Sequence, residues 1–339
     1  MRDGPVVHVL TQYAWPDDAP TGIYAEHVAD ALADEGVRVR LVAGTGRYRE
    51  GQRPAPRTPV ERLPHREGRR ERLLSVALEY EAVRRSFARH ISDEVREGDV
   101  VLLTSAPPTT VFLHRAVRAR GATGVYWLHD YYPHLIRAVW DPPSLLLRSL
   151  RRLWDRHLAG WDHVVKAAGN IRCPGERAVL IRNWNTLDLG TPRPAQSRTA
   201  LYSGNLGWGH HLPSFLELCR QLVDQGYEVT VRGDGPGMRA LPPWVRAEAP
   251  LSDPAALVRS YWDAEVHLVA GHPRIPDAVF PSKIWNAVAA GRPVRASGFA
   301  GPMLEELEAA RRVQPRAHLR QWVRFLEGLA APSAARQAS

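Results

Sequence analysis

The chain has 339 residues, 44% hydrophobic and 24% charged, which is typical of a soluble globular protein large enough for two domains. Its net charge of +9 suits an anionic partner such as nucleic acid, a phosphorylated substrate or an anionic membrane surface, although genomic base composition explains the arginine excess equally well. Two cysteines exclude a disulfide framework, no uncharged apolar run reaches the ~18 residues of a membrane span, and we expect a cytoplasmic location.

The first half of the sequence predicts strands that alternate with helices. Short apolar runs at 6–10 and 37–43 are typical of buried strands, and the helix between them ends at Gly36. Two further strands are predicted over 100–104 and 124–128, each followed by a turn. This order is that of a parallel α/β sheet, in which ligands collect at the carboxyl edge of the strands.

The arginine-rich segment 61–89 is interleaved with leucine and valine, a pattern that predicts a basic amphipathic helix. Such a helix fits an ordinary solvated face, and it also fits a face that contacts a membrane surface or an acceptor. The sequence leaves both interpretations open, so peripheral contact with the inner membrane face through 61–89 is kept as a hypothesis.

The second half of the sequence repeats this layout without repeating the residues. A strand over 200–203 leads through a glycine-bearing turn at 204–209 into a helix over 212–223. The next strand covers 228–232 and ends in the turn 233–236. Two Rossmann-like halves are implied.

The boundary between the halves is predicted at a segment with glycine, prolines and little apolar periodicity, which is how a domain linker looks. We place the first domain at 1–187, the linker at 188–198 and the second domain at 199–331. The last helix of the second domain can pack back on the first.

Residues 281–294 predict an anion site. Lys283 falls in the first turn of a short helix that Ser282 can cap and that ends near Gly291. Free backbone N–H groups and the lysine ammonium would then lie together, with Asn286 on the same face. An ordinary capped helix with a solvated lysine is the alternative.

Four loops are expected to converge on the cleft between the halves. They are the loop around Gly22, the segments 127–133 and 203–211, and the helix that begins at Lys283. Each of them follows a predicted strand or begins a helix, and therefore lies at a carboxyl edge.

The motifs in these loops resemble a known family. Residues 202–207 read Tyr-Ser-Gly-Asn-Leu-Gly, and the Pro-Ser-Lys helix at 281–283 closes with Ala-Ala-Gly-Arg-Pro-Val. Together with Ile-Arg-Asn-Trp-Asn at 181–185 and His-Asp-Tyr-Tyr-Pro at 129–133, they resemble the retaining nucleotide-sugar glycosyltransferases of family 4, in the branch that acts in bacterial polysaccharide and glycoconjugate synthesis. The resemblance spans most of the chain. It implies the GT-B fold, an α/β architecture of two Rossmann-like domains facing a central cleft.

The resemblance also implies a donor held mainly by the second domain and an acceptor held by the first. Its catalytic residues would be Lys283 at the diphosphate, with His129 and Asp130 near the sugar. The donor-binding residues would be Gly22, Asn205, Leu206, Gly207, His210, Gly233, Asp234, Ser282, Lys283 and Asn286. The expected donor is a UDP-linked hexose or N-acetylhexosamine, transferred with retention and without metal or cofactor, because fixed cations can stabilise the leaving diphosphate.

Two departures from the family pattern bear on activity. The paired glutamates of many members fall here at Ala278 and Asn286, so both carboxylates are missing. Asn286 can still bond a ribose hydroxyl, and Asp277 is either a substitute sugar contact or an ordinary loop aspartate. The usual arginine–lysine pair is also absent, which leaves His210 or Arg274 as the candidate second cation beside Lys283.

Other interpretations stay open at this stage. The missing carboxylates fit a catalytically silent relative that binds a nucleotide sugar or glycan. The charge of +9 fits a nucleic-acid-binding protein, but the chain lacks the motifs of that class, so no nucleic-acid partner is expected. His129 can be a core histidine, and His210 with His211 predicts no metal site because adjacent side chains point apart.

Overall fold

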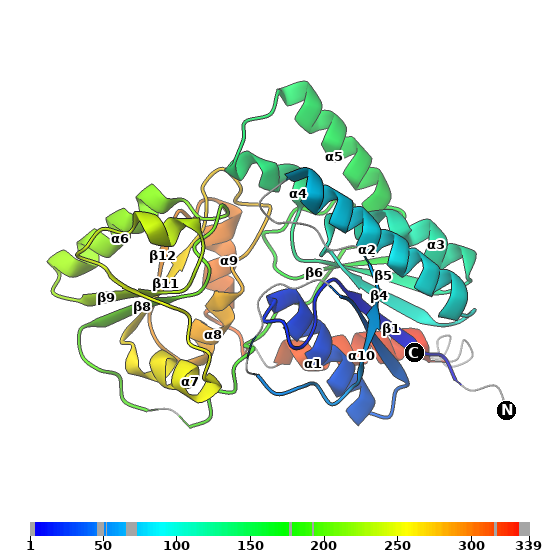
Figure 1. The fold of residues 1–339 in the computed structure, drawn as a ribbon, viewed down its shortest axis with the longest axis horizontal. Coiled ribbons are helices and arrows are strands. Elements are labelled where there is room, and N and C mark those ends of the chain that lie inside the picture. Colours follow the sequence, from blue (N-terminus) through cyan, green and yellow to red (C-terminus); the bar gives the residue numbers. More distant parts are fainter. Residues whose placement is uncertain are drawn as a thin grey trace.

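The structure, a computed structural model, describes residues 4–45, 51, 53–65, 73–175, 178–191, 193–314 and 317–331. Its two parallel sheets lie side by side (Figure 1). The first sheet has seven strands in the order β3-β2-β1-β4-β5-β6-β7. These strands are β1 (Val7–Thr11), β2 (Val39–Gly44), β3 (Val60–Leu63), β4 (Val100–Thr104), β5 (Thr123–Leu128), β6 (His163–Lys166) and β7 (Ala178–Leu180). Because β1 and β4 are buried along their whole length, helices must cover both faces of this sheet.

The helices of the first half follow the strands in alternation. They are α1 (Pro20–Asp34), α2 (Leu73–Glu94), α3 (His114–Ala119), α4 (Tyr132–Leu135) and α5 (Ser144–Leu158), with short 3₁₀ turns at Pro108–Leu113 and Ile136–Ala138. In Figure 1, α5 stands at the top of this half, away from the second sheet.

The second sheet has five strands in the order β10-β9-β8-β11-β12. Its strands are β8 (Thr199–Ser203), β9 (Glu228–Arg232), β10 (Arg246–Glu248), β11 (Val266–Ala270) and β12 (Val294–Ser297). Its helices are α6 (Leu212–Asp224), α7 (Pro254–Asp263), α8 (Lys283–Ala289) and α9 (Pro302–Ala310), with a 3₁₀ turn at Pro236–Ala240. The expectation of two Rossmann-like sheets is confirmed, and β4 and β9 coincide with the predicted strands.

The C-terminal helix α10 (Ala317–Ala330) connects the core of the first sheet to helix α8. It packs against α1, and its Trp322 ring lies 4.3 Å from that of Trp127 on β5. On the other side, His318 contacts Trp285 of α8 at 5.6 Å between ring centres. The buried side of α8 is therefore held by a helix that belongs to the core of the first half.

The basic segment 61–89 is not the single amphipathic helix that the sequence predicted. Its start belongs to β3, because residues 60–63 pair with the end of β2, and the described part of its helix is α2, Leu73–Glu94. The arginines at 66–72 lie outside the described residues. Arg62 donates to the carbonyls of Gly44 and Ala14 at 2.6 and 2.8 Å, so this guanidinium joins loops to the sheet edge and does not form a solvated face.

Further along α2, Arg84 and Arg85 both pair with Glu81. Helix α2 carries four acidic residues against three arginines, so the described part of α2 has no net positive charge to offer a membrane. Within the described residues, no helix combines the length and the apolar character needed to cross a bilayer.

Candidate functional site

Two adjoining cavities of about 320 Å³ each lie between the two halves. The first, the hinge-side cavity, is lined by Thr186 and Leu187 of the connecting segment and by loops of both halves. The second, the His129-side cavity, is lined by His129, Asp130 and Tyr132. Both cavities share the same four wall residues, Pro20, Tyr24, Ser282 and Lys283. They therefore form neighbouring compartments of one cleft, with Lys283 where they meet.

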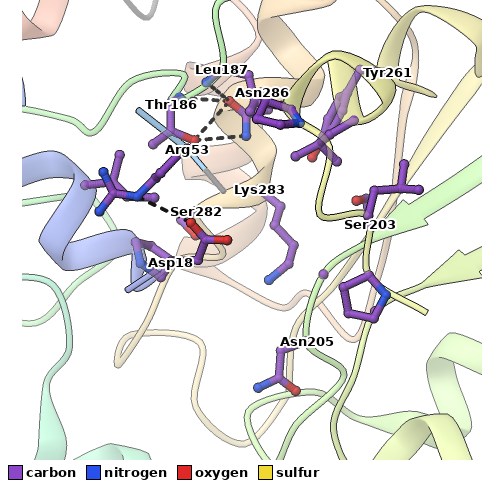
Figure 2. Close-up of a pocket in the computed structure, with 18 of the residues that line it drawn as sticks. Asp18, Arg53, Thr186, Leu187, Ser203, Asn205, Tyr261, Ser282, Lys283 and Asn286 are labelled. Carbon is purple, nitrogen blue, oxygen red and sulfur yellow. Dashed lines mark hydrogen bonds and ion pairs between the residues drawn. The ribbon is translucent and has the colours of Figure 1, made fainter. Parts of the chain in front are cut away.

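Lys283 reaches the cleft through space that a glycine leaves open. A Cβ atom on Gly204 would lie only 1.4 Å from the Lys283 Cε, and Gly204 has a φ of +148°. Glycine at 204 is thus needed both for the backbone conformation and for the lysine stem. Figure 2 shows the lysine side chain extending from α8 towards the loop that carries Asn205. Of the 45 basic residues only Lys166 and Lys283 are lysines, so a narrow, compact cation is retained here in an arginine-rich chain.

The loops after β8 and β9 pass very close to each other. A Cβ on Gly233 would lie 1.8 Å from the Gly204 carbonyl oxygen, and the Leu206 amide donates to the Asp234 carbonyl at 2.8 Å. Gly233, Asp234 and Asn205 line the hinge-side cavity, as expected of donor-binding residues.

Leu206 and Gly207 do not line either cavity. Leu206 is 1% exposed and packs in the core of the second half, so its contribution is to hold the two glycine loops together. The Gly207 amide donates to His210 Nδ1 at 3.0 Å. The sequence prediction assigned these two residues to a ligand, whereas the structure assigns them to the packing of the loop.

His210 lines the His129-side cavity but does not supply a second positive charge. Burial, together with the nearby charge of Lys283, lowers the pKa of His210 to about 4. The imidazole is therefore neutral near pH 7 and, without gaining a proton, cannot act as the cation expected to replace the missing family lysine.

His129 and Asp130 lie at the end of β5, and both of their backbone amides donate to Ser105 Oγ, at 3.0 and 3.3 Å. The His129 ring packs against Tyr24 and Trp127, with ring centres 6.0 and 4.7 Å away. Burial lowers the pKa of His129 to about 3 and raises the pKa of Asp130 to about 7. This wall of the cleft consequently holds a neutral imidazole and a carboxyl group that can carry a proton near neutral pH.

Asp277 lines neither cavity. Its carboxylate lies 2.9 Å from His134 Nδ1. Burial alone would raise the pKa of Asp277, but the hydrogen bond and charge of His134 outweigh it and the pKa is lowered. The adjoining Ala278 carbonyl accepts from the Tyr131 amide at 2.7 Å. Asp277, the suggested sugar contact, thus helps to hold the loop before α8 against the loop after β5.

Asn286 lines the hinge-side cavity, yet its amide is committed to the connecting segment (Figure 2). Its Oδ1 accepts from the amides of Thr186 and Leu187 at 2.8 and 3.2 Å, and its Nδ2 donates to Thr186 Oγ1 at 3.2 Å. The sequence prediction gave this side chain to a ribose. In the structure it fixes the hinge against α8.

Two other expected site residues have structural explanations. Ser282 lies on the cleft wall, but its backbone is helical and its side chain makes no capping hydrogen bond, so the expected N-cap is absent. Gly22 is buried in the first turn of α1, where a Cβ would lie 2.3 Å from the Tyr13 carbonyl oxygen. The close backbone approach at Gly22 is therefore made by the chain itself.

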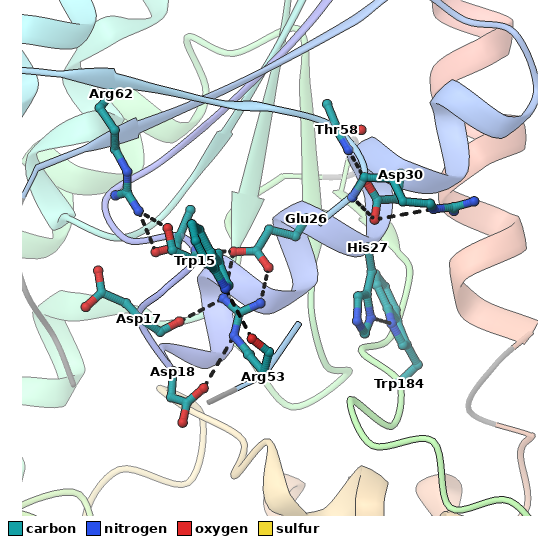
Figure 3. Close-up of polar contacts among 12 residues, drawn as sticks. Trp15, Asp17, Asp18, Glu26, His27, Asp30, Arg53, Thr58, Arg62 and Trp184 are labelled. Carbon is teal, nitrogen blue, oxygen red and sulfur yellow. Dashed lines mark hydrogen bonds and ion pairs between the residues drawn. The ribbon is translucent and has the colours of Figure 1, made fainter. Parts of the chain in front are cut away.

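An ion-pair cluster on the first-half wall was missed by sequence reasoning (Figure 3). Arg53 forms a bidentate ion pair with Glu26, which is 2% exposed, and also donates to the Asp17 carbonyl at 2.8 Å. Asp18 lies 3.3 Å from the Arg53 Nε. Arg53 lies in a segment without periodicity, 27 positions from Glu26 of α1, so no local signal connects them.

Arg232 is a second missed residue of the hinge-side cavity. It stands at the end of β9, where its guanidinium pairs with Glu248 at 2.6 Å. Its position directly before Gly233 at a strand end could have indicated it, because that is where ligands collect in parallel sheets. Among the described residues, no group of three histidine, cysteine, aspartate or glutamate side chains could hold a metal ion.

Comparison with known proteins supports the fold at low sequence identity. No protein-family model matches the chain, and no curated protein matches its sequence. An α,α-trehalose 6-phosphate synthase from Burkholderia multivorans is 14% identical with a TM-score of 0.57, covering 99% of this chain and 91% of its own. The pneumococcal O-GlcNAc transferase GtfA, in complex with UDP and GlcNAc, is 8% identical with a TM-score of 0.57, and the match covers 98% of this chain and 100% of its own. A trehalose-6-phosphate structure from E. coli bound with UDP-2-fluoro glucose is 9% identical with a TM-score of 0.55, and the match covers 96% of this chain and 95% of its own.

These likenesses confirm the expected architecture. The protein has a GT-B-like fold of two parallel α/β sheets, and its cleft lies where the carboxyl edges of both sheets meet. No comparison assigns the chain to glycosyltransferase family 4.

Proposed function

We propose that this protein is a glycosyltransferase that transfers a sugar from a nucleotide-sugar donor, a UDP-linked hexose or N-acetylhexosamine, to an acceptor hydroxyl with retention at the anomeric carbon. The observation that carries the proposal is Lys283, which passes through the space left by Gly204 to the junction of the two cavities. The UDP complexes among proteins of the same fold support this choice of donor class.

The two cavities suit the two parts of such a donor. The nucleotide would occupy the hinge-side cavity, between the glycine loops of the second half and Tyr261 of α7. The sugar would extend past Lys283 into the His129-side cavity. Lys283 would then face the bond between the sugar and the diphosphate.

The chemistry requires charge stabilisation more than a protein nucleophile. The acceptor oxygen forms a bond to the anomeric carbon while the carbon–phosphate oxygen bond breaks, and a departing phosphate oxygen takes the acceptor proton. Negative charge grows on the diphosphate, where a fixed ammonium lowers the barrier. Neutral His129, and Asp130 in its protonated form, would hydrogen-bond sugar hydroxyls without adding a charge that competes with Lys283. A metal is not required by this arrangement.

A catalytically silent nucleotide-sugar-binding protein is the second candidate. It is favoured by the burial of Ala278 and by the engagement of Asn286 with the hinge, because both positions lack the family carboxylates. Turnover separates the two candidates.

The test is a thermal-shift screen against nucleotides and nucleotide sugars, followed by a transfer assay with the donor that binds. A ligand at 100 times its dissociation constant raises the stability by about 2.7 kcal/mol. We expect stabilisation by UDP and by one UDP-sugar, and transfer that survives EDTA. Binding with neither transfer to any acceptor nor hydrolysis of the donor would favour the silent candidate. Absence of stabilisation by any nucleotide would contradict both candidates.

A further inference from the structure

Helix α5 and the segment before it expose an unusual number of large apolar side chains. Val139, Trp140, Leu145, Leu146 and Leu153 are each between 40% and 70% exposed. We call these five residues the α5 face. They make up half of the large hydrophobic side chains that are exposed in the described part of the chain. Scattered apolar residues are normal on a protein surface, whereas a contiguous group indicates a contact site.

The exposure follows from the sequence of α5. Trp154 and Leu158 bury one side of the helix against the first half. Leu146 and Leu153 are seven positions apart, so they lie on one side of the helix and widen its apolar stripe beyond the buried strip. The core uses only part of the stripe, and the remainder faces outward on the helix that stands at the edge of the molecule in Figure 1.

The charges beside the apolar stripe are of one sign. Arg148, Arg152 and Arg156 are exposed on α5, and none of them forms an ion pair within the described residues. The helix contains a single acidic residue, Asp155, whose carboxylate accepts from the Tyr131 hydroxyl at 2.6 Å. Asp141, before the helix, pairs with Arg274.

Leucines and a tryptophan next to unpaired arginines match the surface of an anionic bilayer. The apolar side chains can enter the boundary between headgroups and acyl chains, and the arginines can contact lipid phosphates. We propose that the protein docks peripherally on anionic membranes through the α5 face. The same charges complement an acidic protein less well, because the apolar residues would need a matching groove.

The α5 face is also connected to the cleft. Helix α4 begins two residues after Asp130, and Tyr132 at its start lines the His129-side cavity. The chain reaches Trp140 eight residues after Tyr132. A bilayer under α5 would thus hold an amphiphilic molecule near that cavity. The docking itself does not depend on the proposed transfer activity, and it replaces the segment 61–89 as the membrane contact.

The experiment is co-sedimentation with phosphatidylcholine vesicles that contain or lack phosphatidylglycerol. The full chain should bind the anionic vesicles, and high salt should weaken the binding. A triple variant, Leu145→Ser with Leu146→Ser and Leu153→Ser, should bind about tenfold more weakly, as should Arg148→Gln with Arg152→Gln and Arg156→Gln. The matched control is Leu78→Ser with Leu304→Ser, which removes exposed leucines elsewhere and should bind as the wild type does.

Each variant must first melt at the wild-type temperature, which is expected because the substituted side chains are exposed. Absence of binding to anionic vesicles, binding by both α5 variants that equals that of the wild type, or loss of binding in the Leu78 and Leu304 control would overturn the proposal. A concentration-dependent dimer that only the leucine triple variant abolishes, without any vesicle binding, would instead identify the α5 face as a contact between two copies.

Discussion

The two walls of the cleft are built in opposite ways. The wall of the second half is formed mainly by backbone atoms, because the loops at Gly204 and Gly233 pass so closely that neither residue tolerates a side chain. The side chain of Lys283 crosses the space that Gly204 leaves. The wall of the first half is formed mainly by side chains, because Tyr24 and His129 belong to a buried aromatic cluster without net charge.

Charge is also treated differently on the two walls. The cation of the first wall, Arg53, is bound to the buried carboxylate of Glu26 and so is compensated within the protein. His210 beside Lys283 is neutral, which leaves the lysine as the main cation where the cavities meet. The comparison suggests that the second wall stabilises a ligand's charge, while the first wall fixes the shape of the site. The following predictions test this division.

The largest expected effect is on stability, from the first wall. Arg53→Ala leaves the Glu26 carboxylate buried without its partner, and breaking a buried pair in this way costs about 3–5 kcal/mol. Denaturant unfolding measures the loss. The matched control is Arg57→Ala, which removes an exposed pair with Asp34 and should change the stability by no more than about 1 kcal/mol. Equal losses in the two variants would mean that the Arg53 cluster does not organise this wall.

The next effect is on turnover, from the second wall. In Gly204→Ala the new methyl group would overlap the Lys283 stem, so the flexible lysine must move and turnover should fall by roughly 10²-fold. Gly209→Ala is the control in the same loop, because a Cβ there meets nothing within 4 Å. Steady-state rates with the accepted donor make the comparison. A Gly204→Ala enzyme with normal turnover would show that the lysine position is not critical.

A smaller effect is expected at the hinge. Asn286→Ala removes the acceptor for the Thr186 and Leu187 amides, which should cost about 1–3 kcal/mol of stability. Asn205→Ala, also on the cavity wall, should cost less, since its Oδ1 has no partner among the described residues. If Asn286→Ala instead melts normally and binds the donor more weakly, the side chain serves the ribose and the hinge interpretation is wrong.

The last effect is a gradual dependence of stability on pH. Burial lowers the pKa of ten histidines, so the fold favours their neutral forms over an unfolded chain with pKa values near ~6.5. These histidines are His8, His90, His114, His129, His157, His163, His210, His267, His272 and His318. Their contribution is fully present above ~6.5 and is lost as the pH falls from there towards about 4.

Asp130 works in the opposite direction, because its raised pKa favours folding at low pH and this contribution is lost as the pH rises through about 7. Asp130 is a single group, whereas ten histidines change the stability in the opposite direction. The melting temperature should therefore fall steadily from about pH 6.5 down to pH 5, before ordinary carboxylates titrate. A constant melting temperature over this interval would contradict the burial of the histidines.

The parts of this protein that the sequence predicts are those set by neighbouring residues. Strand positions, the glycine turns at 204 and 233 and the lysine of α8 are local signals, and the two turns and the lysine lie at the cleft. The carboxyl-edge rule then brings together loops that are far apart in the sequence. The GT-B-like architecture follows from the same alternation of elements.

The parts that it does not predict depend on contacts between distant segments. Asn286 turns to the hinge because Thr186 and Leu187 present backbone amides to it. His210 is neutral because the cleft buries it next to Lys283. The pairing of Arg53 with Glu26 arises in the same way. A pattern of residue types shows which groups are present, but their hydrogen-bond partners and charge states are decided by packing.

The most direct measurement of the central claim compares the chain's two lysines. Lys283→Met removes the cation at the junction of the cavities, whereas Lys166→Met removes a lysine that donates to the Gly169 carbonyl in the first half. The account predicts that kcat falls about 10²–10³-fold in Lys283→Met with a smaller change in donor affinity, because the charge it stabilises grows in the transition state. Lys166→Met should keep its kcat. Near-wild-type kcat in a folded Lys283→Met enzyme would contradict the account.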